Sequence, residues 1–177
     1  MLNKSVNFPS VVKITIPQHD RRIKISEKQR PKFKTVTDKK TGEKVKKIVN
    51  MDAIDTPKYW VVNGQQFYSS MHPGMRITVM RKIKEYINPY LPKKLKVPEQ
   101  WHGKIKIYLN FYDYLPKTGI WDCDNQWPWI KAFTDSIVAA GIIPDDSIEY
   151  VRSNGQVNFF PVTEEKDRKL EFCIECL

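Results

Sequence analysis

The sequence predicts one α+β domain in which a mixed β-sheet is packed by two main helices. The chain has 177 residues, of which 41% are hydrophobic, and this suits a single globular domain, since domains commonly run to about 100–200 residues. Hydrophobic residues alternate with polar ones in several short segments and recur at helical spacing in two longer ones. Because the strand-like segments precede, separate and follow the helical ones, we expect a mixed sheet covered by helices.

The amino-terminal part predicts a strand, a basic arm and a hairpin. Val11 to Ile16 alternate between apolar and polar side chains, as a half-buried strand does. Between Asp20 and Asn50 there are twelve Lys or Arg residues against four acidic ones, and this insertion is expected to form a flexible arm or a hairpin that turns near Thr41-Gly42. Tyr59 to Phe67 are expected to form a second hairpin, because Asn63-Gly64 is a strong two-residue turn signal.

Two longer segments predict the main helices. The first runs from about Pro73 to Asn88, with Ser69 or Ser70 as its cap. The second opens near Lys131 and ends at Gly141, a residue type that readily takes the left-handed conformation at a helix end. Each helix carries an apolar stripe, formed by Val79, Met80, Ile83 and Ile87 in the first and by Ile130, Phe133, Ile137, Val138 and Ala140 in the second.

The remaining strands follow a Pro- and Lys-rich connector at Leu91 to Trp101, which is too short to mark a domain boundary. Lys104 to Asp113 alternate clearly, with apolar side chains on one face. Beyond the second helix we expect two short strands about Asn154-Gly155 and a last strand. These three strands cover Ile148 to Arg152, Val157 to Phe160, and Lys169 to Glu175.

Composition favours a polyanionic partner. The formal net charge is +10, and neutralisation of phosphates by Lys and Arg releases counterions and drives binding. The plain alternative is a soluble basic surface with no such partner. The three cysteines suit a reducing compartment, and the Cys173-x-x-Cys176 pair is not expected to bind zinc, because no second pair of ligands accompanies it. No run approaches the roughly 20 apolar residues that span a bilayer, so a soluble intracellular protein is expected.

Acidic residues gather on both sides of the second helix, which is unusual in so basic a chain. Asp122 and Asp124 precede the helix, and Asp145 and Asp146 follow it. Mg²⁺ prefers oxygen ligands and is often held by one or two carboxylates together with substrate phosphates. Lys131 lies between the two groups and could polarise a bound phosphate, but its spacing from Asp135 equally suits a plain i, i+4 ion pair.

These residues resemble the RusA-like Holliday-junction resolvases. The similar order is Asp122-x-Asp124-Asn125, then Lys131-x-x-x-Asp135-x-Ile137, then Gly141 followed by Asp145-Asp146. Pro161-Val162-Thr163 and the last strand look like that family's carboxyl-terminal segment. The likeness is close over the last third of the chain, whereas before it only the order of elements agrees. A short insertion containing Trp127-Pro128-Trp129 departs from the family pattern; we expect its tryptophans to pack in the interior, with stacking on a DNA base as the alternative.

The resemblance implies a homodimeric endonuclease of the bacterial or phage-infected cytoplasm. Such an enzyme resolves Holliday junctions by paired phosphodiester hydrolysis during DNA recombination and repair. The ion is Mg²⁺, with Mn²⁺ as an alternative, and no small-molecule cofactor is expected. By the resemblance, Asp122, Asp124 and Asp146 are the catalytic metal ligands, Asp145 is a reserve ligand, and Lys131 is catalytic.

Contacts with four-way or branched DNA are expected mainly in the basic arm. The candidates are Arg21, Arg22, Lys24, Lys39, Lys40, Lys44, Lys46 and Lys47. Two other functions remain open: a catalytically inactive protein that binds branched DNA architecturally, and a basic RNA-binding module. The sequence has no phosphate-binding loop of the G-x-x-x-x-G-K type and no H-E-x-x-H motif, which disfavours the enzyme classes that use them.

Overall fold

The computed structural model describes residues 9–17, 22–29, 31–39, 41–49, 51, 54–115 and 122–177. Its main sheet has four strands in the order β1-β8-β6-β7. β6 and β7 run parallel, while β1 with β8 and β8 with β6 run antiparallel, so the predicted mixed sheet is confirmed. The strands are β1 (Val11–Pro17), β6 (Ile105–Asp113), β7 (Val151–Pro161) and β8 (Lys169–Cys176).

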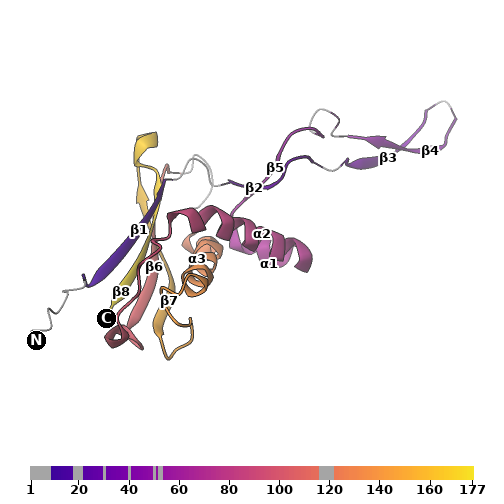
Figure 1. Ribbon diagram of the computed structural model, residues 1–177. Helices are drawn as coiled ribbons and strands as arrows, with labels where there is room; N and C mark the ends of the chain where they lie inside the picture. The colour runs from indigo at the N-terminus through magenta and orange to yellow at the C-terminus, as the bar shows by residue number, and fades with distance from the viewer. Residues whose placement is uncertain are drawn as a thin grey trace, which may run out of the picture.

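Helices cover one face of this sheet (Figure 1). The two main helices, α2 (Pro73–Ile87) and α3 (Trp127–Ala139), pack against each other, and α3 is the crossover between the parallel strands β6 and β7. The ring of Phe133 on α3 stacks on Phe172 of β8, with centroids 4.3 Å apart and planes 7° from parallel. Shorter helical segments are α1 (Gly64–Ser69), η2 (Asn88–Tyr90), η3 (Glu99–Trp101), η4 (Cys123–Gln126) and η5 (Glu165–Asp167). No helix in the described part of the chain is both long and apolar enough to cross a bilayer.

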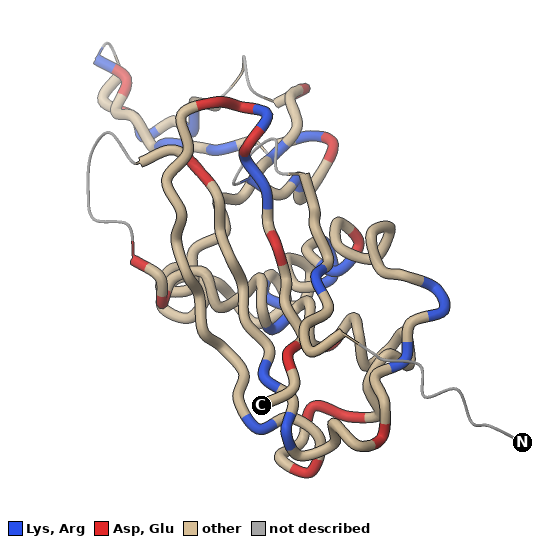
Figure 2. The backbone as a smooth tube through the Cα atoms, turned by 90° about the vertical axis from the view of Figure 1, so that its left-hand side faces the viewer, with Lys and Arg blue, Asp and Glu red and all other residues tan. Residues whose placement is uncertain are grey.

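The opposite face of the sheet carries a ladder of polar side chains that joins all four strands. Figure 2 shows the backbone of the sheet with its acidic and basic positions coloured. Asn158 donates to the Oδ1 atom of Asn110 at 2.9 Å, and Asn110 donates to Glu171 at 2.9 Å. The ammonium of Lys13 lies 3.3 Å from the same carboxylate. Glu171 is only 6% exposed, and although burial tends to raise its pKa, the hydrogen bond from Asn110 and the contact with Lys13 together lower it.

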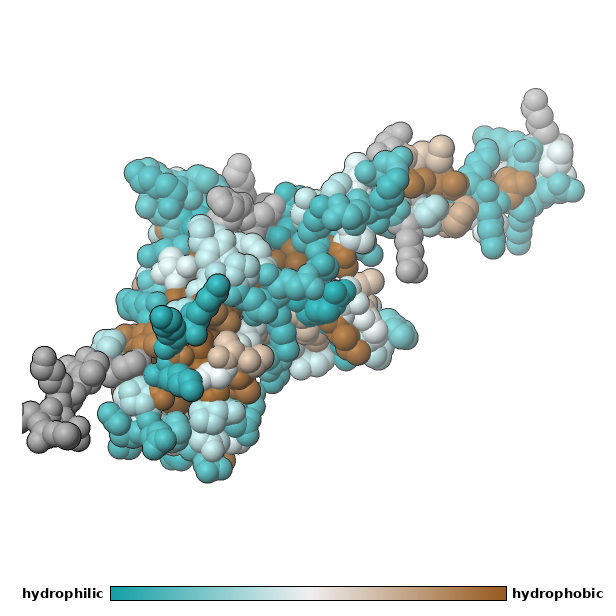
Figure 3. All heavy atoms as spheres, viewed as in Figure 1, coloured by the Kyte–Doolittle hydropathy of each residue, from teal (hydrophilic) through white to brown (hydrophobic). Residues whose placement is uncertain are grey.

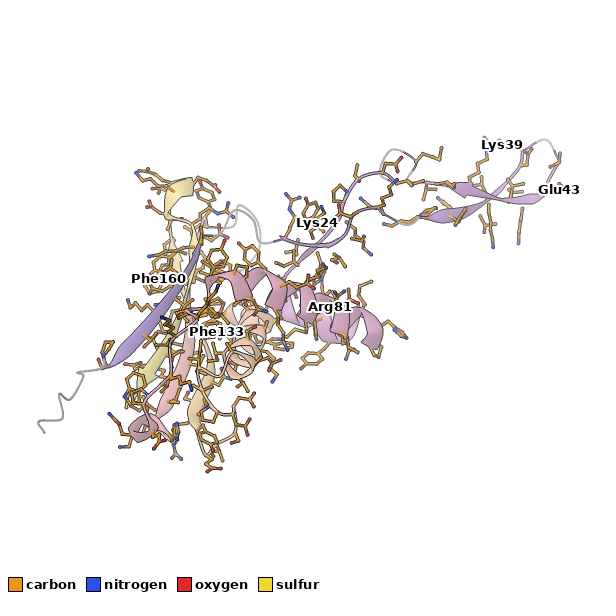
Figure 4. The ribbon with its side chains drawn as sticks, in the orientation of Figure 1. Lys24, Lys39, Glu43, Arg81, Phe133 and Phe160 are labelled. Carbon is orange, nitrogen blue, oxygen red and sulfur yellow. The ribbon has the colours of Figure 1, made fainter. Side chains whose placement is uncertain are left out.

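A two-stranded arm extends from the helical side of the body (Figures 1 and 4). Its base is β2 (Arg22–Ser26) paired with β5 (Lys58–Val61), and its outer part is the hairpin of β3 (Phe33–Thr37) and β4 (Lys44–Ile48). Gly42 has φ 73° in the connecting turn, which confirms the turn predicted near Thr41-Gly42. All but one of the side chains of β3 and β4 are exposed, and apolar side chains are visible among the hydrophilic ones along the arm (Figure 3).

The hairpin predicted at Asn63-Gly64 is wrong. Asn63 caps α1 instead, because its side chain accepts a hydrogen bond from the backbone N–H of Gln66 at 3.1 Å. Gly64 is required there by packing, since a Cβ atom at this position would collide with the indole of Trp127. The predicted Ser69 or Ser70 cap of α2 is also wrong: the Nδ1 atom of His72 accepts from the backbone N–H of Gly74 at 3.2 Å.

The two short strands predicted about Asn154-Gly155 are one continuous strand, β7. Gly155 has φ 119°, and the pairing of β7 with β6 shifts register at this end, so the chain passes through the glycine without reversing. The helix predicted to open near Lys131 begins earlier, at Trp127, with Pro128 in its first turn and η4 directly before it. Lys131 therefore lies one turn inside α3.

Candidate active site

The η4 segment fixes the first pair of predicted acids. One carboxylate oxygen of Asp122 accepts from the backbone N–H of Asp124 at 3.0 Å, and the other accepts from Asn125 at 3.1 Å. The Oδ1 atom of Asn125 accepts from the backbone N–H of Gln65 at 2.9 Å, which ties η4 to the start of α1. Asp122 and Asp124 are both exposed, so their carboxylates are accessible from solvent.

Lys131 joins the second acidic group to α3. Its ammonium lies 2.7 Å from Asp135, which confirms the i, i+4 pair, and 3.2 Å from Asp146. Asp135 also contacts Lys84 of α2 at 2.7 Å. The hydrogen bond to Asp135 has the largest effect on the pKa of Lys131 and raises it. The hydrogen bond to Asp146 raises it further, while partial burial has the opposite effect. Burial tends to raise the pKa of Asp135, but the hydrogen bonds from Lys131 and Lys84 outweigh it and lower that pKa.

The structure distinguishes the two neighbouring acids after the helix. Asp146 is the one that contacts Lys131. Asp145 instead accepts from the backbone N–H of Asp146 at 2.7 Å and is exposed. Of the two predicted ligands, Asp146 is therefore the one that the fold brings back beside the first turns of α3.

The acids supply oxygen ligands of the kind that Mg²⁺ takes, but they are held in two places. Asp122 and Asp124 share η4, whereas Asp146 is paired with Lys131. Within the described segments, no three His, Cys, Asp or Glu residues gather closely enough to hold a metal ion. The residue types thus fit the ion, while their arrangement is a pair of carboxylates at the start of η4 and a third that is held by Lys131.

The predicted DNA-contacting residues divide between the base and the outer part of the arm. At the base, the guanidinium of Arg22 lies 5.3 Å from the ring centroid of Tyr59, and Lys24 pairs with Glu27 at 2.7 Å. The outer hairpin exposes Lys39, Lys44, Lys46 and Lys47 to solvent, with Lys39 near its far end (Figure 4). The predictions for Arg21 and Lys40 lie outside the described residues.

The inserted tryptophans take different positions. Trp129 is fully buried, which confirms interior packing for this residue. Trp127 is half-buried and stacks on Tyr68 of α1, with centroids 5.0 Å apart and planes at 17°, while Phe67 meets it edge-on at 5.3 Å. The guanidinium of Arg76 lies 5.5 Å from the Tyr68 ring centroid. The sequence did not predict this cluster of Trp127 with Tyr68 and Phe67, because Tyr59 to Phe67 were expected to form a hairpin. The aromatic residues close to that segment were nevertheless a signal from which an aromatic cluster could have been predicted.

A scan against models of known protein families finds no match for this chain, and a search among curated proteins finds none either.

Proposed function

We propose that the protein is a Mg²⁺-dependent, structure-selective endodeoxyribonuclease that acts on four-way DNA junctions. The contact between Lys131 and Asp146 at 3.2 Å carries the proposal. It places an acid that follows α3 beside the first turns of the helix, at the end that η4 precedes with Asp122 and Asp124. In this proposal the acids at the start of η4 and the Lys131–Asp146 pair serve one reaction centre at this end of α3, where hydrolysis of a phosphodiester needs both carboxylates and a cation.

Each residue has a role in this proposal. Asp122, Asp124 and Asp146 would hold the ion, with Asp145 in reserve. When bound, Mg²⁺ neutralises charge on the scissile phosphate and makes hydroxide more available. Lys131 places a compact positive charge beside the acids, where it can stabilise charge that develops on a phosphate oxygen.

The basic arm supports a nucleic-acid substrate. Lys34 of β3 lies directly opposite Lys47 of β4, and like charges in directly opposed positions destabilise a hairpin. A bound phosphate relieves that repulsion, so a polyanion suits the arm. A homodimer completes the proposal, because a junction with near-twofold symmetry needs two matched cuts and a C2 dimer supplies two related sites.

The decisive experiment compares wild type with Asp124→Asn and with Asp167→Asn on a synthetic mobile four-way junction. Asp167 is an exposed acid of η5, so its substitution removes the same charge outside the site. Strand mapping should show paired nicks for wild type and Asp167→Asn only with Mg²⁺ or Mn²⁺. Asp124→Asn should bind the junction and not cut it. Unchanged cutting by Asp124→Asn with junction binding retained would refute the catalytic assignment.

The alternative of an architectural protein that binds branched DNA without cutting it also has an observation in its favour. Asp135 and Asp146 share Lys131, and Asp135 also pairs with Lys84, so two lysines already balance the charge of these two acids. Under this alternative the wild-type protein binds the junction with equal affinity with and without Mg²⁺ and produces no nicks. Competition with linear duplex and structured RNA in the same assay separates both proposals from a basic RNA-binding module, for which RNA would compete as well as the junction.

A further inference from the structure

We propose that a groove along α2 binds an unpaired nucleotide of the DNA substrate, an inference that rests on the proposed action on branched DNA. The groove has a volume of about 420 Å³ and is lined by Phe67, Arg76, Ile77, Met80, Arg81 and Lys84. Its side chains are of two kinds, apolar ones and cations, and no acid is among these lining residues. None of these residues belongs to the acidic site or the arm.

The apolar side chains offer a surface for a planar base. Phe67 is a buried core residue, Met80 is half-buried, and Ile77 is 71% exposed. Ile77 and Met80 line the groove together, so a ligand there would cover apolar area from both side chains. Every base has an apolar face, so contacts of this type do not require a particular sequence.

The cations supply the complementary charge for the phosphates on either side of that base. Arg76 is fixed in place, because its guanidinium donates to the carbonyl oxygens of Tyr68 at 2.6 Å and Met71 at 3.0 Å. Arg81 contacts Glu85 at 3.0 Å within α2, and Figure 4 shows Arg81 on this helix. Arginine can stack its planar group on bases as well as contact phosphates.

The groove adjoins the candidate active site through two sets of contacts. At one side, Phe67 meets the edge of Trp127, the first residue of α3 after η4, at 5.3 Å. At the other, Lys84 contacts Asp135, which also holds Lys131. A base held in the groove would therefore lie next to residues that contact the start of α3 and the Lys131–Asp135 pair. At a branch point the stacking of base pairs is interrupted, so a nucleotide there leaves its pair at a lower cost than within a plain duplex.

Charge argues against a second copy of the chain as the occupant. A twofold axis through the groove would place Arg76, Arg81 and Lys84 opposite the same cations of the partner, and an isologous interface requires a self-complementary surface. A nucleotide brings the opposite charge. We therefore commit to an unpaired nucleotide and treat self-association as an outcome of the test.

The test measures binding without cleavage, in EDTA, so that it does not depend on nuclease activity. The probe is a DNA fork with 2-aminopurine at an unpaired position next to the branch, and fluorescence reports stacking while anisotropy reports affinity. The variants are Ile77→Glu, which places a carboxylate at an exposed groove position, and Ile77→Ser, which removes apolar surface without adding charge. Leu177→Glu is the matched control, because Leu177 is also exposed, at 60%, and lies outside the groove.

We expect Ile77→Glu to weaken fork binding about 10-fold or more and to abolish the fluorescence change, with Ile77→Ser intermediate and Leu177→Glu like wild type. Affinity for linear duplex should stay the same in all four proteins. The inference is overturned if Ile77→Glu binds the fork like Leu177→Glu, or if it loses fork and duplex binding equally. It is also overturned if the variant changes the molecular mass in solution while fork binding stays intact. If the groove result holds and no junction is cut in Mg²⁺, the nuclease proposal alone fails.

Discussion

At the scale of single residues, Lys131 is the contact between α3 and the acidic pair that follows it. Its pairing with Asp135 follows from helical spacing alone, since side chains four residues apart meet on one face. Its pairing with Asp146 depends on the path of the chain after the helix, and spacing could not predict it. The first contact is therefore structural, and the second links the residue to the proposed chemistry.

Replacement of Lys131 by Met should reduce single-turnover cleavage of a four-way junction at saturating Mg²⁺ by about 10²–10³-fold, as the loss of one electrostatic contact to the reacting group commonly does. Lys131→Arg should retain part of the rate, because it keeps the charge. The control is Lys166→Met, since Lys166 contacts Glu164 on an exposed turn. If the Lys131→Met protein cuts at the wild-type rate, Lys131 has no catalytic role and only forms ion pairs within the fold.

Glu171 provides a prediction about pH. Its pKa in the folded protein lies below the usual 4.5, so its ionised form stabilises the fold above that pH, and this contribution is lost as the pH falls through the folded pKa. Glu171→Gln should reduce the free energy of unfolding at pH 7 by about 1.5–3 kcal/mol, the range for hydrogen bonds to charged groups. Urea titrations should show this difference at pH 7, and the two proteins should converge in acid once the pH is below the folded pKa of Glu171, which itself lies under 4.5. A difference in the free energy of unfolding that stayed the same from pH 7 into acid would contradict the lowered pKa of Glu171.

Local sequence signals were informative where one interaction dominates and misleading where packing decides. The alternation in β6 predicted its buried face correctly, because Ile105, Ile107, Leu109 and Phe111 are all fully buried. Asn63-Gly64 is a strong turn signal, yet Asn63 is also a good helix cap, and the contact of Gly64 with Trp127 favours the helix. That contact joins residues far apart in the sequence, so no local pattern could reveal it.

At the scale of elements, the β3–β4 hairpin differs from the rest of the structure because its side chains have little to pack against. Its strands pair in register from Phe33 with Ile48 to Thr37 with Lys44. The pattern places lysines on both faces, with Lys44 and Lys46 on one and Lys34 and Lys47 on the other. An isolated two-stranded hairpin is at best marginally stable in water, so the arm is the element that a partner would affect most.

Substitution of Lys34, Lys44, Lys46 and Lys47 by Gln should weaken DNA binding uniformly across sequences. The slope of log affinity against log salt should become shallower by about 3–4, if each lysine neutralises one phosphate. The control replaces four exposed lysines of the body, Lys93, Lys94, Lys96 and Lys104, which gives the same change in net charge. Equal slopes for the two variants would show that the arm has no special contact with phosphate.

The two helices and the β7 strand show what an element's sequence can predict. Both helices bury most of the predicted apolar stripe, because burial of one face repeats every helical turn. Ala140 is the exception: it caps the end of α3 and is exposed. β7 was read as two strands because Asn154-Gly155 interrupts the alternation. Its pairing with β6 continues through the glycine, and a parallel partner so distant in sequence leaves no local signal.

At the scale of the whole molecule, the core lies between the sheet and the helices, and the outer arm contributes nothing to it among the described residues. The four-stranded sheet, α2 and α3 therefore determine the stability of the body. The general architecture followed from the order of the elements. The position of Asp146 beside Lys131 did not, because it depends on the path of the loop that follows the helix.

Phe133→Ala should reduce the free energy of unfolding by about 3–5 kcal/mol, because it removes a fully buried ring from the centre of the core and leaves a cavity. Val36→Ala, a truncation on the exposed hairpin, should change it by about 0.5 kcal/mol or less. Urea denaturation followed by circular dichroism provides the comparison. Similar losses in the free energy of unfolding for the two variants would mean that the arm unfolds cooperatively with the core.

The position of the arm within the chain has a consequence for proteolysis. The arm is inserted after β1, whose seven residues pair with β8 and which buries Ile14 and Ile16 in the core. A protease that cuts after lysine would reach the exposed hairpin first and sever the peptide there. The amino-terminal fragment would nevertheless stay attached through β1, so the nicked protein would migrate as two bands under denaturing conditions while remaining a single folded particle in solution.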